Sequence, residues 1–223
     1  MMKKMMSILM AVALAFTFAA CGQAQQTEST DPSIADAQPS NTQSRSEALT
    51  QNVPETTEAA GIEGKTLIVY FSWSTSGNTE KMATYIQEQT GGDLLKLEPL
   101  NPYPTDYEEC GNVALAERDE DARPEIANLP QSIAEYDTIF VGYPIWWHTA
   151  PMIIGTFLEH YDWTGVEIYP FAQSASMDTE QFDNSMEFVR ESAAEANVHD
   201  GLFAEATDID GIQEYLTANG FAK

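Results

Sequence analysis

The chain has 223 residues and a formal net charge of −25 at pH 7. This length accommodates one domain of ordinary size together with additional segments. So large a negative charge argues against binding to nucleic acid or to an anionic membrane surface, and it suits a soluble protein that meets basic partners.

Residues 1–21 have the features of a targeting segment. Lysines near the start are followed by an almost uninterrupted apolar stretch, residues 8–18, and by small residues before Cys21. The pattern predicts a secretory signal, because the apolar stretch is shorter than the ~20 residues of a membrane-spanning helix. The segment from Phe18 to Cys21 also resembles a bacterial lipobox, which implies a lipid on Cys21 and an extracytoplasmic location at the cell envelope. The alternative is cleavage near Ala20, which leaves a free thiol.

Residues 22–64 are rich in Gln, Thr, Ser, Pro and Ala and have little apolar content. Such a composition cannot bury enough surface to fold, so we expect a disordered tether. A flexible chain of this length spans roughly 35–40 Å. The folded domain is therefore expected over residues 65–223, with the membrane reached only through the lipid anchor.

From residue 65 onward, strand-like and helix-like patterns alternate. Short apolar runs predict strands at 67–71, 94–97, 138–143, 166–171 and 201–204. Amphipathic or polar stretches predict helices at about 77–90, 105–121, 151–161, 179–197 and 209–219. This alternation predicts an α/β domain with a parallel sheet and helices on both faces.

A hydroxyl-rich turn joins the first predicted strand to the first predicted helix. It consists of Ser74, Thr75, Ser76, Gly77, Asn78 and Thr79. The unpaired N–H groups and the dipole of a helix start favour an anion there, and Gly77 lets the backbone come close to it. No basic residue lies between Ser72 and Glu80, so the turn suits a phosphate held by neutral donors. The alternative is an ordinary capped helix start.

The order Ser-Thr-Ser-Gly-Asn-Thr after a strand resembles the phosphate loop of the flavodoxins. The longer pattern Val-Tyr-Phe-Ser-x-x-x-x-Gly-Asn-Thr resembles bacterial flavodoxin-like proteins, and the resemblance extends over residues 65 to about 220. It implies a doubly wound, five-stranded flavodoxin-like sheet in the order 2-1-3-4-5. It also implies FMN as the cofactor, at the switch point between the first and third strands.

A second unusual loop, Pro144, Ile145, Trp146 and Trp147, follows the third predicted strand. Adjacent tryptophans at the end of a strand suit stacking on a flat ligand, although packing against the next helix is the alternative. The resemblance implies that this loop forms one wall of the FMN site, with Trp146 at the ring-stacking position. Many flavodoxins have Gly after that tryptophan, and its carbonyl can flip. We expect Trp147 to resist the positive φ that such a flip needs.

A third loop, containing Gln173 and Ser174, follows the fourth predicted strand. The resemblance implies that it approaches the pyrimidine side of the flavin ring, although a polar loop that only leads into the next helix is an equal alternative. His148 lies beside the tryptophans and has no assigned role. The histidines and cysteines do not have the spacing of a metal site, so no metal is expected.

Two further features receive structural interpretations. Cys110 lies beside the acidic stretch 106–109, which is expected to raise the pKa of the thiol, so we interpret it as structural or incidental. The acidic run 117–121 is interpreted as a solvated helix face.

Three functions are consistent with these features. The first is an FMN-binding electron carrier at the cell envelope, which exchanges electrons with a partner protein or a small-molecule acceptor. The second is an FMN-dependent oxidoreductase of the quinone reductase type, linked to NAD(P)H or quinol. The third is a flavin-free binding module with the same fold. The sequence assigns no catalytic residue.

Overall fold

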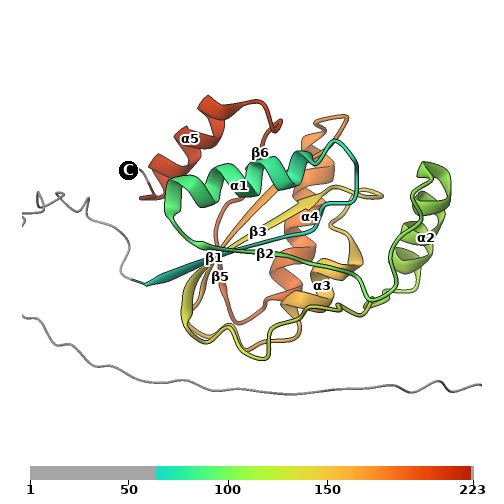
Figure 1. Cartoon of the computed structure of the whole chain (residues 1–223), viewed down its shortest axis with the longest axis horizontal. Helices are drawn as coiled ribbons and strands as arrows, with labels where there is room; N and C mark the ends of the chain where they lie inside the picture. The colour runs from blue at the N-terminus through green and yellow to red at the C-terminus, as the bar shows by residue number, and fades with distance from the viewer. Residues whose placement is uncertain (1–63, 222–223) are drawn as a thin grey trace, which may run out of the picture. The chain divides into compact units, whose positions relative to one another are not determined.

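The computed structural model describes residues 64–221 (Figure 1). The predicted signal segment 1–21, its Cys21 and the predicted tether up to Glu63 lie outside the described residues, so the expectations about them stay predictions. Among the described residues, no helix has the length and apolar character needed to cross a bilayer.

The centre of the domain is a parallel sheet. Its strands are β1 (Lys65–Tyr70), β2 (Asp93–Lys96), β3 (Tyr136–Pro144), β4 (Glu167–Gln173), β5 (Asn197–Val198) and β6 (Leu202–Phe203). The strand order is β2-β1-β3-β4-β5, and β6 also pairs with β4. This confirms the predicted flavodoxin-like α/β fold and its order 2-1-3-4-5.

The fifth position of the sheet differs from the prediction. Two short strands, β5 and β6, occupy it in place of one continuous strand, and they pair with opposite ends of β4. The preceding helix ends at Ser192, not at Asn197, because Asn197 already begins β5. Gly201 lies between the two strands, where an added Cβ would come within 2.7 Å of the Met186 sulfur. This close approach of the chain to α4 (Thr179–Ser192) accompanies the interruption.

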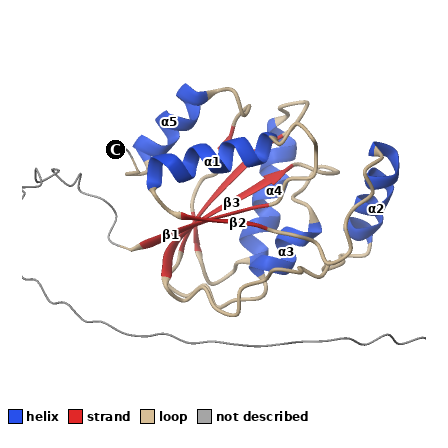
Figure 2. Ribbon diagram, viewed as in Figure 1, coloured by secondary structure: helices blue, strands red, loops and turns tan. Residues whose placement is uncertain are grey.

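Helices cover both faces of the sheet. The other helices are α1 (Asn78–Thr90), α2 (Tyr107–Asp119), α3 (Met152–Leu158) and α5 (Ile209–Ala218). Successive strand residues point to opposite faces, so Ile68 packs with residues of α1 and α5, whereas Val69 packs with residues of α3 and α4. Figure 2 shows α1 and α5 together on one side of the strands and α3 and α4 on the other. This two-sided burial explains the uniformly apolar strands.

The helix α2 belongs to neither layer. It lies to one side of the sheet in Figure 1, and only its Cys110 and Ala114 are buried. Its start is capped by Asp106, which accepts hydrogen bonds from the N–H groups of Glu108 and Glu109, both at 3.0 Å. The helix therefore forms largely from local signals, and its position depends on contacts with the loops beside it.

Candidate functional site

The loops singled out in the sequence leave the sheet at one edge. Because β1, β3 and β4 are adjacent and parallel, their carboxyl ends lie together. The N–H of Phe71 donates to the carbonyl of Gly142 at 2.9 Å, and the N–H of Ile145 donates to that of Gln173 at 3.1 Å. The structure thus brings the predicted phosphate loop, the tryptophan loop and the third loop to one edge.

The predicted phosphate loop leads into an uncapped helix. Gly77, the N-cap residue of α1, has φ 60° and no side chain caps the helix. The N–H of Gly77 bonds back to Ser74, and the next backbone bond is from Lys81 to Gly77. The N–H groups of residues 78–80 have no partner among the described residues. Aspartates cap α2, α4 and α5, whereas α1 and α3 have no side-chain cap, and of these two only α1 begins in the hydroxyl-rich turn; its open start is therefore a place for an external acceptor.

The hydroxyls of this loop add to the free N–H groups. Thr79 is only 2% exposed, yet its hydroxyl has no hydrogen-bond partner among the described residues. The oxygen still reaches the surface, because in this part of the chain every fully buried side-chain oxygen has a partner. Ser74 and Ser76 are exposed and their hydroxyls lie 2.7 Å apart. Lys96 pairs with Glu80, the acidic residue in the first turn of α1, at 3.0 Å. The donor set therefore suits a phosphate.

Trp146 is fixed by surrounding aromatic rings. It makes edge-to-face contacts with Phe71, Trp73 and Tyr103, at centroid distances of 5.3, 6.1 and 5.2 Å. Trp73 is in turn anchored by its indole N–H, which donates to the carbonyl of Pro104 at 2.8 Å. The side chain of Trp146 remains half-buried at the site, and its predicted stacking on a flavin ring stays a prediction.

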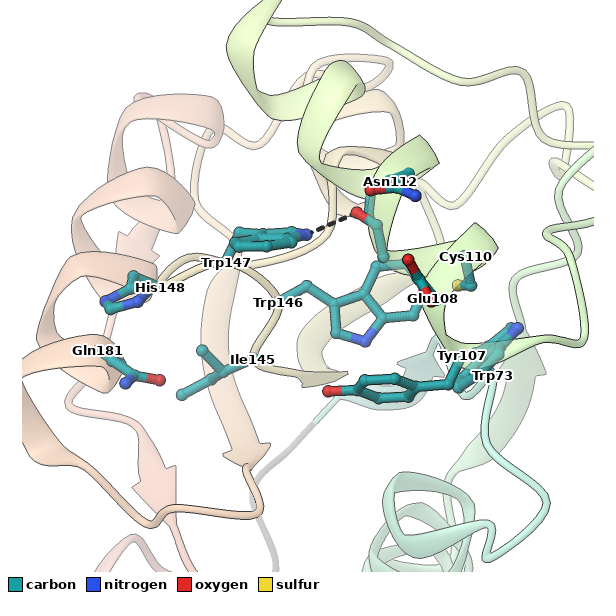
Figure 3. Close-up of a pocket in the computed structure, with 12 residues that line it drawn as sticks. Trp73, Tyr107, Glu108, Cys110, Asn112, Ile145, Trp146, Trp147, His148 and Gln181 are labelled. Carbon is teal, nitrogen blue, oxygen red and sulfur yellow. Dashed lines mark hydrogen bonds between the residues drawn. The ribbon is translucent and has the colours of Figure 1, made fainter.

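A cavity of about 580 Å³ lies between α2 and the tryptophan loop (Figure 3). Its aromatic lining consists of Trp73, Tyr107, Trp146 and Trp147. Its volume is typical of small-molecule sites, and Glu108 contributes the one carboxylate of its lining. Of the predicted site residues, Ile145, Trp146 and Trp147 line this cavity. Pro144, the phosphate loop and the third loop lie outside its lining.

The third loop is held by its own hydrogen bonds. The hydroxyl of Ser174 accepts from the N–H of Met177 at 3.1 Å and lies 3.2 Å from the hydroxyl of Ser176. Gln173 joins the tryptophan loop through its backbone carbonyl. These contacts fix the shape of the loop, while the predicted approach of Gln173 and Ser174 to the ring stays a prediction.

Residues 146–149 form a tight turn. The N–H of Trp146 donates to Thr149 at 2.9 Å, and the N–H of Thr149 donates back at 3.0 Å. Trp147 and His148 have φ values of 47° and 69°, which is the geometry of a type I′ turn without glycine or asparagine. Such positions cost about 1–3 kcal/mol each. The expectation that Trp147 resists positive φ is therefore wrong.

Contacts from α2 explain how Trp147 keeps this conformation. Its indole N–H donates to the carbonyl of Gly111 at 2.8 Å, drawn as a dashed line in Figure 3. The guanidinium of Arg118 donates to the carbonyl of Trp147 at 3.1 Å and lies 5.9 Å from its ring centroid. The backbone and the side chain of one strained residue are thus both tied to the helix.

The helix α2 also supports Trp146, through Glu117, the residue before Arg118. Glu117 accepts a hydrogen bond from the hydroxyl of Tyr103 at 2.7 Å, and the Tyr103 ring packs on Trp146. Burial raises the pKa of Glu117, although the Tyr103 hydrogen bond acts in the opposite direction. The interpretation of residues 117–121 as a solvated face is therefore wrong for Glu117 and Arg118. Glu117 binds Tyr103, which packs on Trp146, and Arg118 binds Trp147.

Cys110 is a buried thiol in the wall of the cavity. Burial, together with a smaller contribution from the nearby Glu117, raises its pKa to about 11. The predicted direction is correct, but Glu117 replaces the expected stretch 106–109 as the acidic contributor. The thiol stays protonated at neutral pH, so its role is structural. Within residues 64–221, no group of side chains forms a metal site.

Comparisons with known proteins agree with this geometry. A family model described as flavodoxin matches residues 65–218. The chain belongs to the flavodoxin family. It is similar to putative flavoproteins from Bacteroides eggerthii (31% identity, 70% of this chain and 98% of that chain, TM-score 0.62) and Bacteroides uniformis (30%, 69% and 98%, TM-score 0.62). It is also similar to a flavoprotein from Lactobacillus acidophilus in complex with FMN (27%, 66% and 97%, TM-score 0.55). No curated protein matches.

Several residues of this flavodoxin domain were missed in the sequence. Trp73 directly precedes the phosphate loop, and a large aromatic residue among small polar ones was a signal of a second role. Tyr107 is 83% exposed at the start of a polar helix and contacts Trp73, at 6.4 Å between ring centroids. Gly111 and Arg118 carry no sequence signal of their own, because their partner, Trp147, is distant along the chain.

Proposed function

We propose that the domain binds FMN and carries electrons between redox partners at the cell envelope. The observation that carries this proposal is the open start of α1, with the free N–H groups of residues 78–80 and the unpartnered hydroxyl of Thr79. The FMN complex of the Lactobacillus relative supports FMN as the cofactor. When bound, FMN supplies the redox chemistry.

The residues of the site suit both the phosphate and the ring of this cofactor. The N–H groups and hydroxyls at the start of α1 would hold the phosphate without a cation, because the helix dipole already favours negative charge there. Trp146, fixed by its aromatic neighbours, would offer a rigid wall to the ring. The cavity between α2 and the tryptophan loop lies beside that wall.

The charge of the surface supports a carrier with a basic partner. In the described part of the chain, the lysines and arginines that form ion pairs are Lys65, Lys96, Arg118, Arg123 and Arg190. Because these cations already have carboxylate partners and the chain is strongly acidic, most acidic side chains remain uncompensated. An acidic surface attracts a basic redox protein and accelerates their encounter at low ionic strength.

The envelope location rests on the sequence of residues 1–21, whose basic start, apolar stretch and Cys21 predict a lipid-anchored signal. Within the domain, Lys65 begins β1, so the amino end of this strand lies at the edge of the sheet opposite the loops of the site.

A reductase is the second candidate, and the cavity favours it. His148 and Gln181 add polar groups to the aromatic lining, and a flat acceptor such as a quinone suits such a surface. The NAD(P)H-linked activity would then use the same edge of the sheet, with the cavity as the acceptor site.

Electron-transfer kinetics separate the two candidates. For a carrier, chemically reduced holoprotein should reduce a basic acceptor such as cytochrome c at a rate that falls steeply with salt, because the encounter is electrostatic. Ferricyanide, an anionic acceptor, serves as the control, and its rate should rise with salt. Rapid steady-state oxidation of NAD(P)H with a quinone, together with a salt-independent cytochrome rate, would contradict the carrier and support the reductase.

A further inference from the structure

The turn at residues 146–149 lacks the usual means of holding a positive-φ conformation. Neither Trp147 nor His148 is a glycine or an asparagine, although both have positive φ. Burial does not hold them either, since Trp147 is 42% exposed and His148 is also exposed. The cross-turn hydrogen bonds between Trp146 and Thr149 define the turn. On typical values, each of these bonds contributes less than each of the two strained residues costs.

The helix α2 shows the complementary deficiency. With only Cys110 and Ala114 buried, it has little apolar surface to hold it on the domain. Its polar contacts with the turn are the bond from the Trp147 indole to Gly111 and the bond from Arg118 to the Trp147 carbonyl. The helix and the turn therefore stabilise one another.

We propose that Arg118 is a positioning residue, which closes α2 and the 146–149 turn into a clasp and thereby fixes one wall of the cavity. Its guanidinium holds the Trp147 carbonyl toward α2, so the Trp147–His148 peptide keeps one orientation. The clasp stands on the contacts of the protein alone, whereas its effect on the cofactor rests on the proposed FMN function.

The hydrogen bonds of Arg118 fit a positioning role better than they fit the role of an ordinary surface cation. Its Nε and Nη2 both donate to Asp119, at 3.0 and 2.6 Å, while Nη1 points to the Trp147 carbonyl. The neighbouring carboxylate thus orients the planar guanidinium before it meets the turn. The same guanidinium lies over the Trp147 ring, which adds a cation–π contact.

Hydrogen exchange of the FMN-free protein tests the clasp directly. Arg118→Ala should speed exchange of the turn amides of Trp146 and Thr149 and of the α2 amides by about tenfold, since one charge-assisted hydrogen bond is lost. Arg118→Lys retains the charge and can still donate a hydrogen bond to the Trp147 carbonyl, and should return the rates to within about threefold of the parent. Arg190→Ala is the matched control, because it removes an exposed arginine paired with Asp200 and should leave both segments unchanged.

The result that would overturn the clasp is parent-like exchange of the turn amides in a folded Arg118→Ala variant. Equal acceleration in Arg190→Ala would also overturn it, since the effect would then be general. A rise confined to α2 would show that Arg118 holds the helix and not the turn.

A cofactor titration supplies a second readout that a purely structural role would not move. Arg118→Ala should shift the midpoint potential of bound FMN, while Arg118→Lys and Arg190→Ala should keep the parent value, because only the first variant frees the peptide. Unchanged potentials in all three would remove the positioning role toward the cofactor. If the parent binds no FMN, the proposed function fails, and the exchange experiment still decides the clasp.

Discussion

Replacing Thr79 by valine should separate cofactor binding from folding. Valine has nearly the shape of threonine, so packing at this 2% exposed position is kept and only the hydroxyl is lost. Because that hydroxyl has no partner among the described residues, its loss should not destabilise the FMN-free domain. A hydrogen bond from it to a charged phosphate is worth about 1.5–3 kcal/mol, so Thr79→Val should weaken FMN binding by about 10- to 150-fold.

Thr79→Ser provides the opposite case. It keeps the hydroxyl and removes a buried methyl, so FMN affinity should stay close to the parent value while the domain loses about 1 kcal/mol of stability. On a domain of this size, that loss lowers the melting temperature by about 2–4 °C.

Titration of the apoproteins followed by flavin fluorescence gives the affinities, and circular dichroism gives the melting temperatures. If a folded Thr79→Val protein binds FMN as tightly as the parent, the phosphate does not lie at the start of α1 and the reasoning is refuted.

Three further predictions concern other parts of the chain. Gly77→Ala places a side chain at φ 60°, so the domain should lose about 1–2 kcal/mol of stability in a urea titration. The loss would come from backbone strain, because the added Cβ would meet nothing closer than Glu80 at 3.9 Å. A parent-like urea midpoint would contradict this strain. Glu117→Gln keeps an acceptor for Tyr103 but cannot ionise. Since the folded pKa of Glu117 is raised above 4.5, its stability contribution is present below that pH and is lost as pH rises through the folded value, so the parent should lose more unfolding free energy than Glu117→Gln over that range. Cys21→Ser should move the protein from the membrane fraction to the soluble fraction, and continued retention would contradict lipidation.

Local patterns explain why much of the fold could be predicted from the sequence. The alternation of apolar runs and helices predicts the parallel sheet with helices on both faces, whereas the strand order 2-1-3-4-5 was implied by the resemblance of the hydroxyl-rich turn after β1 to a flavodoxin loop. In each case the determining residues are close together in the chain. The resemblance of that turn to the flavodoxin phosphate loop then indicated the family.

The features that escaped prediction depend on contacts between distant segments. The positive φ of Trp147 is unfavourable on its own and becomes stable because Gly111 and Arg118 bind it from α2. Glu117 looked like part of a solvated acidic run because its partner, Tyr103, lies 14 residues earlier, before the helix begins. The split of the fifth strand is likewise accompanied by a contact between distant segments, the close approach of Gly201 to α4.

The most direct test of the account compares FMN with riboflavin, which lacks the phosphate, by calorimetric titration of the apoprotein. The account predicts one FMN bound per chain, at least about tenfold more tightly than riboflavin, because residues 78–80 and Thr79 donate to the phosphate. Equal affinities for the two ligands, or no saturable binding of FMN, would contradict it.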